Sequence, residues 1–107
     1  MLALEAIADP TRRRIVEILA QGERSVNEIA RSFSVSQPAI SHHLQKLRKA
    51  RLVRARVEAQ RRVYTLDPVG FGEIETWVAD TRAFWQPRLA VFESKLRQDP
   101  RPPRREP

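Results

Sequence analysis

Residues 36–50 read SQPAISHHLQKLRKA and predict one amphipathic helix. Ile40, Leu44 and Leu47 stand at positions i, i+4 and i+7, so their side chains share one face of that helix. The side chains off this face are hydrogen-bonding or cationic, and none is acidic: Ser41, His42, Gln45, Lys46 and Lys49. A solvated surface helix usually includes Asp or Glu, so this composition favours contact with base edges and flanking phosphates.

A second short helix is predicted just before this stretch. Ser25-Val26-Asn27-Glu28 matches the S-x-x-E capping box, in which the Ser hydroxyl and the Glu carboxylate accept hydrogen bonds from free N–H groups. Residues 34–36 then supply a turn of about three residues, and Ser36 caps the next helix. Two short helices joined in this way predict a helix-turn-helix, whose second helix enters the major groove of DNA. The apolar stripe of the first helix is Val26, Ile29, Ala30 and Phe33.

Composition limits the class of protein. A chain of 107 residues predicts one domain with a modest core, and 20 basic against 13 acidic residues favour a polyanionic partner. The absence of cysteine excludes disulfides and thiolate metal ligands. No apolar run approaches the roughly 18 residues of a membrane span, and no signal peptide is visible. We therefore expect a cytoplasmic protein without a membrane partner.

The N-terminal residues are expected to add two further helices. Residues 2–8 predict a short helix, and Asp9-Pro10 predicts the start of another that runs to about Gln21 and is closed by Gly22. This second helix should point Ile15, Ile18 and Leu19 inward. Arg12, Arg13 and Arg14 should point largely outward, as a solvated face or as phosphate contacts.

After the helix-turn-helix, apolar residues occur at every second position. Val53, Ala55 and Val57 alternate with charged residues, which predicts a half-buried strand. Ala59 and Gln60 form a turn, and residues 61–66 return as a second strand with Tyr64 and Leu66 inward. This hairpin would be a wing that reaches phosphates or the minor groove, or else a solvated edge protected by charge. Its arginines are Arg54, Arg56, Arg61 and Arg62.

A long aromatic-rich helix is predicted from Asp67-Pro68 to about Arg97. About thirty residues give a helix roughly 45 Å long, which outruns a domain of this size. Part of its apolar face should therefore pack against a second copy of the chain, although a ligand pocket or another protein would also cover it. Pro87 should kink this helix rather than end it. The Pro- and Arg-rich residues 98–107 predict a disordered basic tail.

The segments DPTRRRI, SVSQPAISHHLQKL and RRVYTLDP resemble the ArsR/SmtB family of bacterial winged-helix repressors. The resemblance implies a mainly α fold over residues 1–97, with about five helices and a two-stranded wing. It also implies a homodimer that binds a palindromic double-stranded operator, with repression released by a signal. Base-facing positions would be Gln37, Ser41 and His42, with a wing contact near Arg61. The implied dimer interface joins the first and last helices through Leu4, Trp77, Val78, Phe84, Trp85, Leu89 and Phe92.

Departures from the family pattern concern metal sensing. Many relatives use a Cys-Val-Cys segment where this chain has Ser25-Val26-Asn27, and neither replacement is a thiolate. In the last helix Asp80 remains, but Arg82 stands two positions on and no histidine follows. The chain therefore resembles a non-metal, autorepressor-like branch, and we expect no metal and no cofactor; an inducer is not identified. The family's usual glycine in the wing turn is Ala59.

The remaining residues indicate no enzyme. His43 lies about 60° from Ile40 around the helix and should be partly buried, whereas His42 faces outward. Adjacent histidines project about 100° apart and do not readily share a metal. No nucleophile–base–acid arrangement is indicated, and three glycines make no phosphate loop. Two functions remain: a dimeric sequence-specific repressor, or a winged-helix module for protein contact with an incidental basic face. Steep salt dependence of DNA binding separates them.

Overall fold

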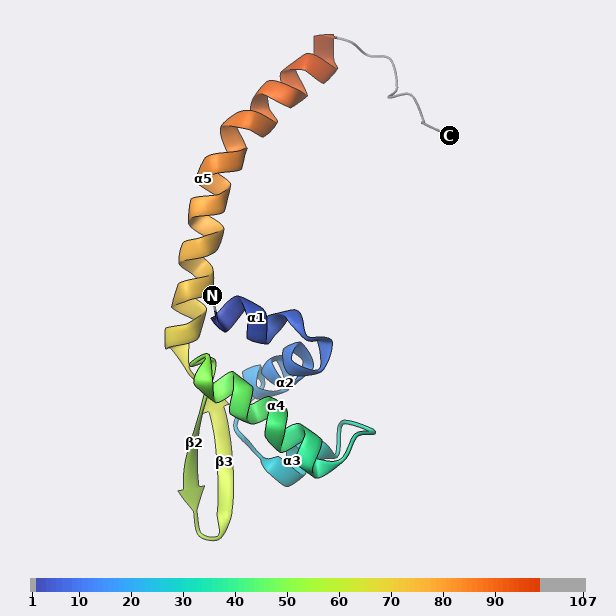
Figure 1. Ribbon diagram of the computed structural model, residues 1–107, viewed down its shortest axis with the longest axis vertical. Helices are drawn as coiled ribbons and strands as arrows, with labels where there is room; N and C mark the ends of the chain where they lie inside the picture. The colour runs from blue at the N-terminus through green and yellow to red at the C-terminus, as the bar shows by residue number, and fades with distance from the viewer. Residues whose placement is uncertain (1, 99–107) are drawn as a thin grey trace. The chain divides into compact units, whose positions relative to one another are not determined.

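The computed structural model describes residues 2–98 (Figure 1). Residues up to Glu75 form one compact unit and a second unit begins at Thr76, so the last helix contributes to both. The predicted tail, apart from Gln98, lies outside the described residues. The elements in chain order are α1 (Leu2–Ala8), α2 (Pro10–Ala20), β1 (Arg24–Ser25), α3 (Val26–Ala30), α4 (Gln37–Lys49), β2 (Val53–Glu58), β3 (Arg61–Leu66) and α5 (Pro68–Gln98).

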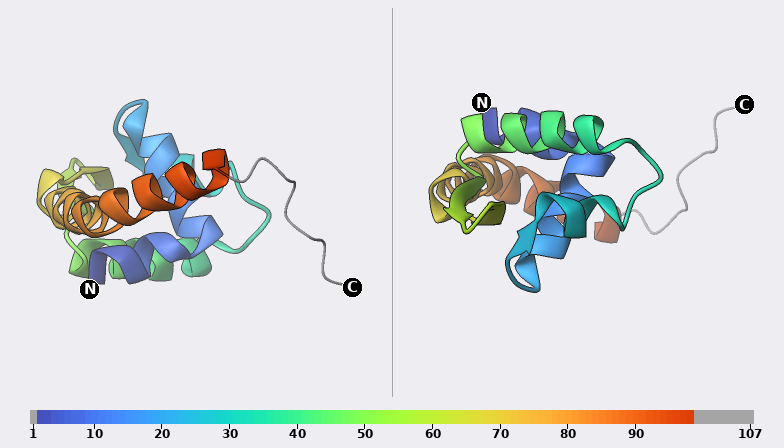
Figure 2. Two further views of the ribbon diagram at one scale, coloured as in Figure 1. Left: turned by 90° about the horizontal axis from the view of Figure 1, so that it is seen from above. Right: turned by 90° about the horizontal axis from the view of Figure 1, so that it is seen from below.

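The core of the first unit is formed by one face each of α2, α3 and α4 together with the start of β2. The three α4 side chains predicted to share a face are fully buried, which confirms that periodicity. Ile18 is only half-buried, because it lies at the edge of the buried arc centred on Ile15 and Leu19. The two views of Figure 2 show α1 lying beside α4. The largest fully buried side chains are Ile15, Ile29, Ile40, Leu44, Leu47, Leu52 and Val53.

Side-chain caps begin the helices where the sequence predicted them. Asp9 Oδ2 accepts from the Arg12 N–H at 3.0 Å ahead of α2, and Ser36 Oγ accepts from the Ala39 N–H at 3.3 Å ahead of α4. The capping box of Ser25 with Glu28 is present at the start of α3. These contacts satisfy N–H groups that have no partner within the helix.

The link between α3 and α4 is longer than predicted. α3 ends at Ala30 and α4 begins at Gln37, so residues 31–36 connect them rather than a turn of about three. The N–H groups of Ser32 and Phe33 bond three residues back, each at 3.1 Å, and these tighter bonds end the helix. Phe33 still packs against the core from this link. Its spacing from Val26, Ile29 and Ala30 therefore indicated correctly that it is buried, but not that the helix extends to it.

The sheet has three strands in the order β1-β3-β2, so the expectation of only two was incomplete. Ser25 of β1 pairs with Val63, which makes β3 the central strand. Val63 and Tyr64 are both buried, although they point to opposite faces of β3. Val57, expected to be half-buried, is 73% exposed, because the outer half of the hairpin extends past the core beside α3 and α4 (Figure 1).

Backbone conformation is unusual at the end of α4 and at the wing turn. Arg51 (φ 58°) and Ala59 (φ 56°) are left-handed without being glycine. The Gly70 N–H donates to the Arg51 carbonyl at 2.7 Å, which joins the start of α5 to the end of α4. A Cβ at Gly70 would lie 2.6 Å from the carbonyl oxygens of both Ala50 and Arg51, so only glycine fits there.

The second unit is helical from Thr76 to Gln98. α5 continues through Pro87, which confirms that this proline does not end the helix (Figure 1). Among the described residues, no helix combines the length and apolar character that crossing a membrane requires. The large apolar side chains of this unit that are exposed are Trp77, Val78, Phe84, Trp85, Leu89, Val91, Phe92 and Leu96.

Candidate nucleic-acid interface

The solvent-facing side of α4 carries all five of the residues predicted to contact DNA from this helix. Gln37, Ser41, His42, Gln45 and Lys46 are exposed, and α4 contains no acidic residue. Ser36 caps the helix and leaves its first turn accessible. The helix therefore presents amide, hydroxyl, imidazole and ammonium groups to any partner, and all of them form hydrogen bonds with bases or phosphates.

A cleft of about 620 Å³ separates α4 from the wing. Four of its lining residues were not among the predicted site residues: the apolar Val26 and Pro38, and the polar Arg48 and Tyr64. Arg48 follows Ser41 and Gln45 at helical spacing, and that spacing was the available signal; Tyr64 had been assigned to the core. Lys46 does not line the cleft but faces a groove beside α1. The residues lining the cleft are Val26, Gln37, Pro38, Ser41, His42, Gln45, Arg48, Arg62 and Tyr64.

The strand register divides the four wing arginines between two faces. Val57 pairs with Arg62 and Ala55 with Tyr64, so Arg62 and Tyr64 lie on the same face of the hairpin. Alternation along the strands puts Arg54, Arg56 and Arg61 on the opposite face. Only Arg62 of the four lines the cleft beside α4.

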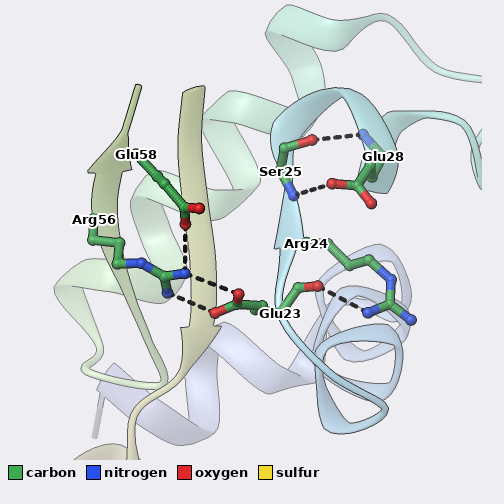
Figure 3. Close-up of polar contacts among 6 residues, drawn as sticks. All are labelled: Glu23, Arg24, Ser25, Glu28, Arg56 and Glu58. Atoms are coloured by element: carbon green, nitrogen blue, oxygen red, sulfur yellow. Dashed lines mark hydrogen bonds and ion pairs between the residues drawn. The ribbon is translucent and has the colours of Figure 1, made fainter. Parts of the chain in front are cut away.

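Arg56 is held by carboxylates. Its Nη1 and Nη2 donate to the two oxygens of Glu23 at 2.6 and 2.8 Å, and Nη2 also donates to Glu58 at 2.8 Å (Figure 3). The hydrogen bonds from Arg56 lower the pKa of Glu23, and the same contacts raise the pKa of Arg56. This bidentate pair links the middle of β2 to the residue before β1.

Arg61 also has an acidic neighbour. Its Nη1 lies 3.5 Å from Glu28 Oε1. The same oxygen accepts the Ser25 N–H at 3.1 Å, as Figure 3 shows. Hydrogen bonding from the Ser25 backbone lowers the pKa of Glu28, so this carboxylate stays charged beside Arg61. Within residues 2–98, Arg62 and Arg54 take part in no ion pair.

Arg12 does not point outward, contrary to the expectation for the three consecutive arginines. Its Nε donates to the Ala6 carbonyl at 2.6 Å, and its Nη1 lies 3.3 Å from His43 Nδ1. His43 is partly buried as predicted, and burial lowers its pKa, which favours the neutral ring that accepts from Arg12. Arg12 thus joins α1 to α4, whereas Arg13 and Arg14 are exposed.

Ser25, which stands where the family resemblance places a metal-binding cysteine, caps α3 in this chain. Ser25 is 6% exposed, and its hydroxyl accepts the Glu28 N–H in the capping box. Over the described part of the chain no cluster of three His, Asp or Glu side chains is close enough to hold a metal.

The residues predicted for the dimer interface are largely exposed on α5. Trp77, Phe84 and Val91 recur at intervals of seven, as do Val78, Trp85 and Phe92, so each set forms a row along the helix. The rings of Phe84 and Trp85 meet edge to face at 5.0 Å. Leu4 of α1 is partly buried within the first unit.

Comparison with known proteins gives consistent results. Residues 9–55 match the family described as bacterial regulatory protein, arsR family. The HTH-type transcriptional regulator Rv2034 of Mycobacterium tuberculosis is 51% identical over 90 residues, which cover 84% of this chain and 81% of that protein. The transcriptional repressor SdpR of Bacillus subtilis is 35% identical over 74 residues, which cover 69% of this chain and 82% of that protein.

A solved structure confirms the predicted fold class. The homodimeric winged helix-turn-helix DNA-binding domain Mb0332 of Mycobacterium bovis matches this chain with a TM-score of 0.62 at 30% identity. The match covers 79% of this chain and 81% of that chain. These relatives are regulators of transcription rather than enzymes, in agreement with the lack of a predicted catalytic residue.

Proposed function

Because this chain belongs to the ArsR family of bacterial transcriptional regulators, we propose that it is a homodimeric repressor of a palindromic operator. The observation that carries the proposal is the acid-free exposed face of α4, which lies beside the cleft under the wing. The name of the relative SdpR supports repression as the outcome of binding.

Base contacts are assigned to the N-terminal half of α4, which faces base edges in this architecture. Gln37 can bond an adenine through both atoms of its amide, and Ser41 and His42 lie one turn further along. Gln45 and Lys46 extend this surface toward the flanking phosphates. On the wing, Arg62 and Arg54 are assigned to the DNA backbone, whereas Arg56 and Arg61 hold the wing in place through Glu23 and Glu28.

Dimerisation is assigned to the apolar rows of α5, with Leu4 of α1 as a further contact. Rows repeating every seven residues are the pattern by which two helices pack along one seam. Phe84 and Trp85 are 51% and 52% exposed in the single chain, so a second copy would cover them. A two-fold dimer would set two copies of α4 about 34 Å apart, one turn of DNA, which corresponds to a palindromic operator.

The test separates base recognition from phosphate binding. An operator is first selected from random duplex DNA with the wild-type protein. Gln37→Ala should lower operator affinity by about 1–3 kcal/mol and leave affinity for scrambled DNA nearly unchanged. Arg62→Ala should weaken both and reduce the salt slope by about one unit, because one phosphate contact is lost. Arg61→Ala is the matched control and should lose less, since Glu28 already pairs with this arginine.

Two results would contradict the proposal. If no sequence is enriched and duplex binding hardly depends on salt, the winged helix serves protein contact instead. If Gln37→Ala loses operator and scrambled binding equally, the base-reading face lies elsewhere.

A further inference from the structure

The cleft between α4 and the wing has a specific place in any complex with DNA. If α4 enters the major groove and the wing reaches the adjacent minor groove, the sugar-phosphate strand between the two grooves must cross this cleft. This step rests on the proposed function. The residues that line the cleft are therefore positioned to meet backbone phosphates rather than base edges.

Tyr64 is the buried side chain in this cleft that has an unused polar atom. The residue is 4% exposed, and its ring belongs to the core. Every fully buried side-chain nitrogen or oxygen in residues 2–98 has a partner, whereas the Tyr64 hydroxyl has none. The hydroxyl therefore lies at the solvent-facing end of an otherwise enclosed ring, on the wall of the cleft. Because this hydroxyl is accessible and has no partner within residues 2–98, it can donate to a ligand in the cleft in exchange for water.

Two arginines line the same cleft from different elements. Arg48 comes from the last turn of α4, and Arg62 comes from β3 on the face that also carries Tyr64. No acidic residue lines the cleft. One hydroxyl donor and two guanidinium groups around an acid-free cleft suit a phosphate monoanion, which accepts several hydrogen bonds at once.

We propose that the Tyr64 hydroxyl, together with Arg48 and Arg62, binds one backbone phosphate of the operator strand that crosses between α4 and the wing. Because the Tyr64 ring is packed in the core, its hydroxyl holds a fixed position that the long arginine side chains lack. Tyr64 would thus position the strand, while the arginines supply the charge. This contact adds two residues, Arg48 and Tyr64, to the DNA-binding set.

The experiment uses Tyr64→Phe, which removes the hydroxyl and keeps the ring. The variant should bind operator and scrambled DNA about tenfold more weakly, because a hydrogen bond to a charged group is lost. Its salt slope should stay unchanged, since a neutral donor displaces no counterion. Arg48→Ala and Arg62→Ala should each reduce the slope by about one unit. Thermal unfolding and sedimentation of Tyr64→Phe serve as controls for the fold and the oligomeric state.

A methylphosphonate scan locates the phosphate. Each phosphate of a selected operator is replaced singly by a neutral methylphosphonate, and every duplex is titrated with wild type and Tyr64→Phe. At one position in each half-site, the replacement should weaken Tyr64→Phe about tenfold less than it weakens wild type, because the variant has already lost the hydroxyl contact while the arginine contacts are lost in both proteins. Equal losses at every position, or a Tyr64→Phe variant that binds as wild type does, would overturn the proposal while leaving the DNA-binding function intact. A wild-type protein that binds no duplex would overturn both.

Discussion

Residues 2–75 and residues 76–98 differ in how far their large apolar side chains are buried. The first unit encloses seven large side chains completely, from Ile15 to Val53. The second unit leaves Trp85 52% and Phe92 58% exposed, although its sequence is the more aromatic of the two. The first unit therefore supplies its own hydrophobic stabilisation, whereas the second carries apolar surface suited to association.

Magnitudes show why this difference matters. A tryptophan presents about 200 Å² of surface, so covering the exposed half of Trp85 would contribute roughly 2–3 kcal/mol at about 25 cal/mol per Å². Several such side chains in rows of seven would supply most of the hydrophobic free energy of a dimer. The two units should thus respond to different mutations: the first in its folding, the second in its association.

The largest effect is expected for Phe84→Ala combined with Trp85→Ala. Each aromatic anchor removed from an interface costs about 2 kcal/mol, and a symmetric dimer loses both rings from each copy, so the dimer dissociation constant should rise by more than about a thousandfold. Sedimentation equilibrium should show monomers, and operator affinity should fall. Gln86→Ala, an exposed polar neighbour on the same helix, is the control. A double variant that remains dimeric would place the interface elsewhere.

The next effect concerns the fold of the first unit. Gly70→Ala would put a methyl group 2.6 Å from two carbonyl oxygens and should lower the free energy of unfolding by about 3 kcal/mol. Gly72→Ala provides the control, because a Cβ there meets nothing within 4 Å. That variant should gain about 0.5–1 kcal/mol from helix propensity. Chemical denaturation measures both, and equal stability of the two variants would show that Gly70 has room to relax.

A smaller gain is expected at the wing turn. Ala59 has a left-handed φ of 56°, which is unfavourable for a residue with a Cβ. Ala59→Gly should therefore raise the free energy of unfolding by about 0.5–1 kcal/mol without changing the dimer. Ala55→Gly, inside β2, should instead lower it by a similar amount. A loss of stability in Ala59→Gly would mean that the turn does not adopt this conformation in solution.

The smallest effect is a dependence on pH. Burial lowers the pKa of His43 below its ordinary value of 6.5, so the unfolded chain binds the proton more readily than the folded one. The stability that neutral His43 supports is fully present above pH 6.5 and should be lost as the pH falls toward the folded pKa. The lowered carboxylate pKa values act below about pH 4.5, so the two ranges are separate. His43→Gln should therefore flatten the dependence of thermal stability on pH below pH 6.5.

Much of the fold could be predicted because its signals are local. Asp9, Ser25 and Ser36 each cap a helix from a position adjacent to it, and the burial of Ile40, Leu44 and Leu47 follows from spacing alone. A strand as short as β1 shows no alternation, so its pairing with β3 left no trace in the sequence. Phe33 led to the wrong prediction of a longer helix before the turn, because a residue can be buried from a loop as well as from a helix.

The candidate DNA-binding site also has a part that could be predicted from local sequence and a part that could not. The sequence by itself determined that α4 would carry exposed polar and basic groups without an acid, because residue types and helical period are enough for that. Only the tertiary structure decided which arginines remain unpaired. Arg56 meets Glu23 across 33 positions of sequence, and the fold places Arg62 on the cleft while Arg61 lies within 3.5 Å of Glu28. Such pairings depend on which segments meet in space, and side-chain order along one element carries no information about that.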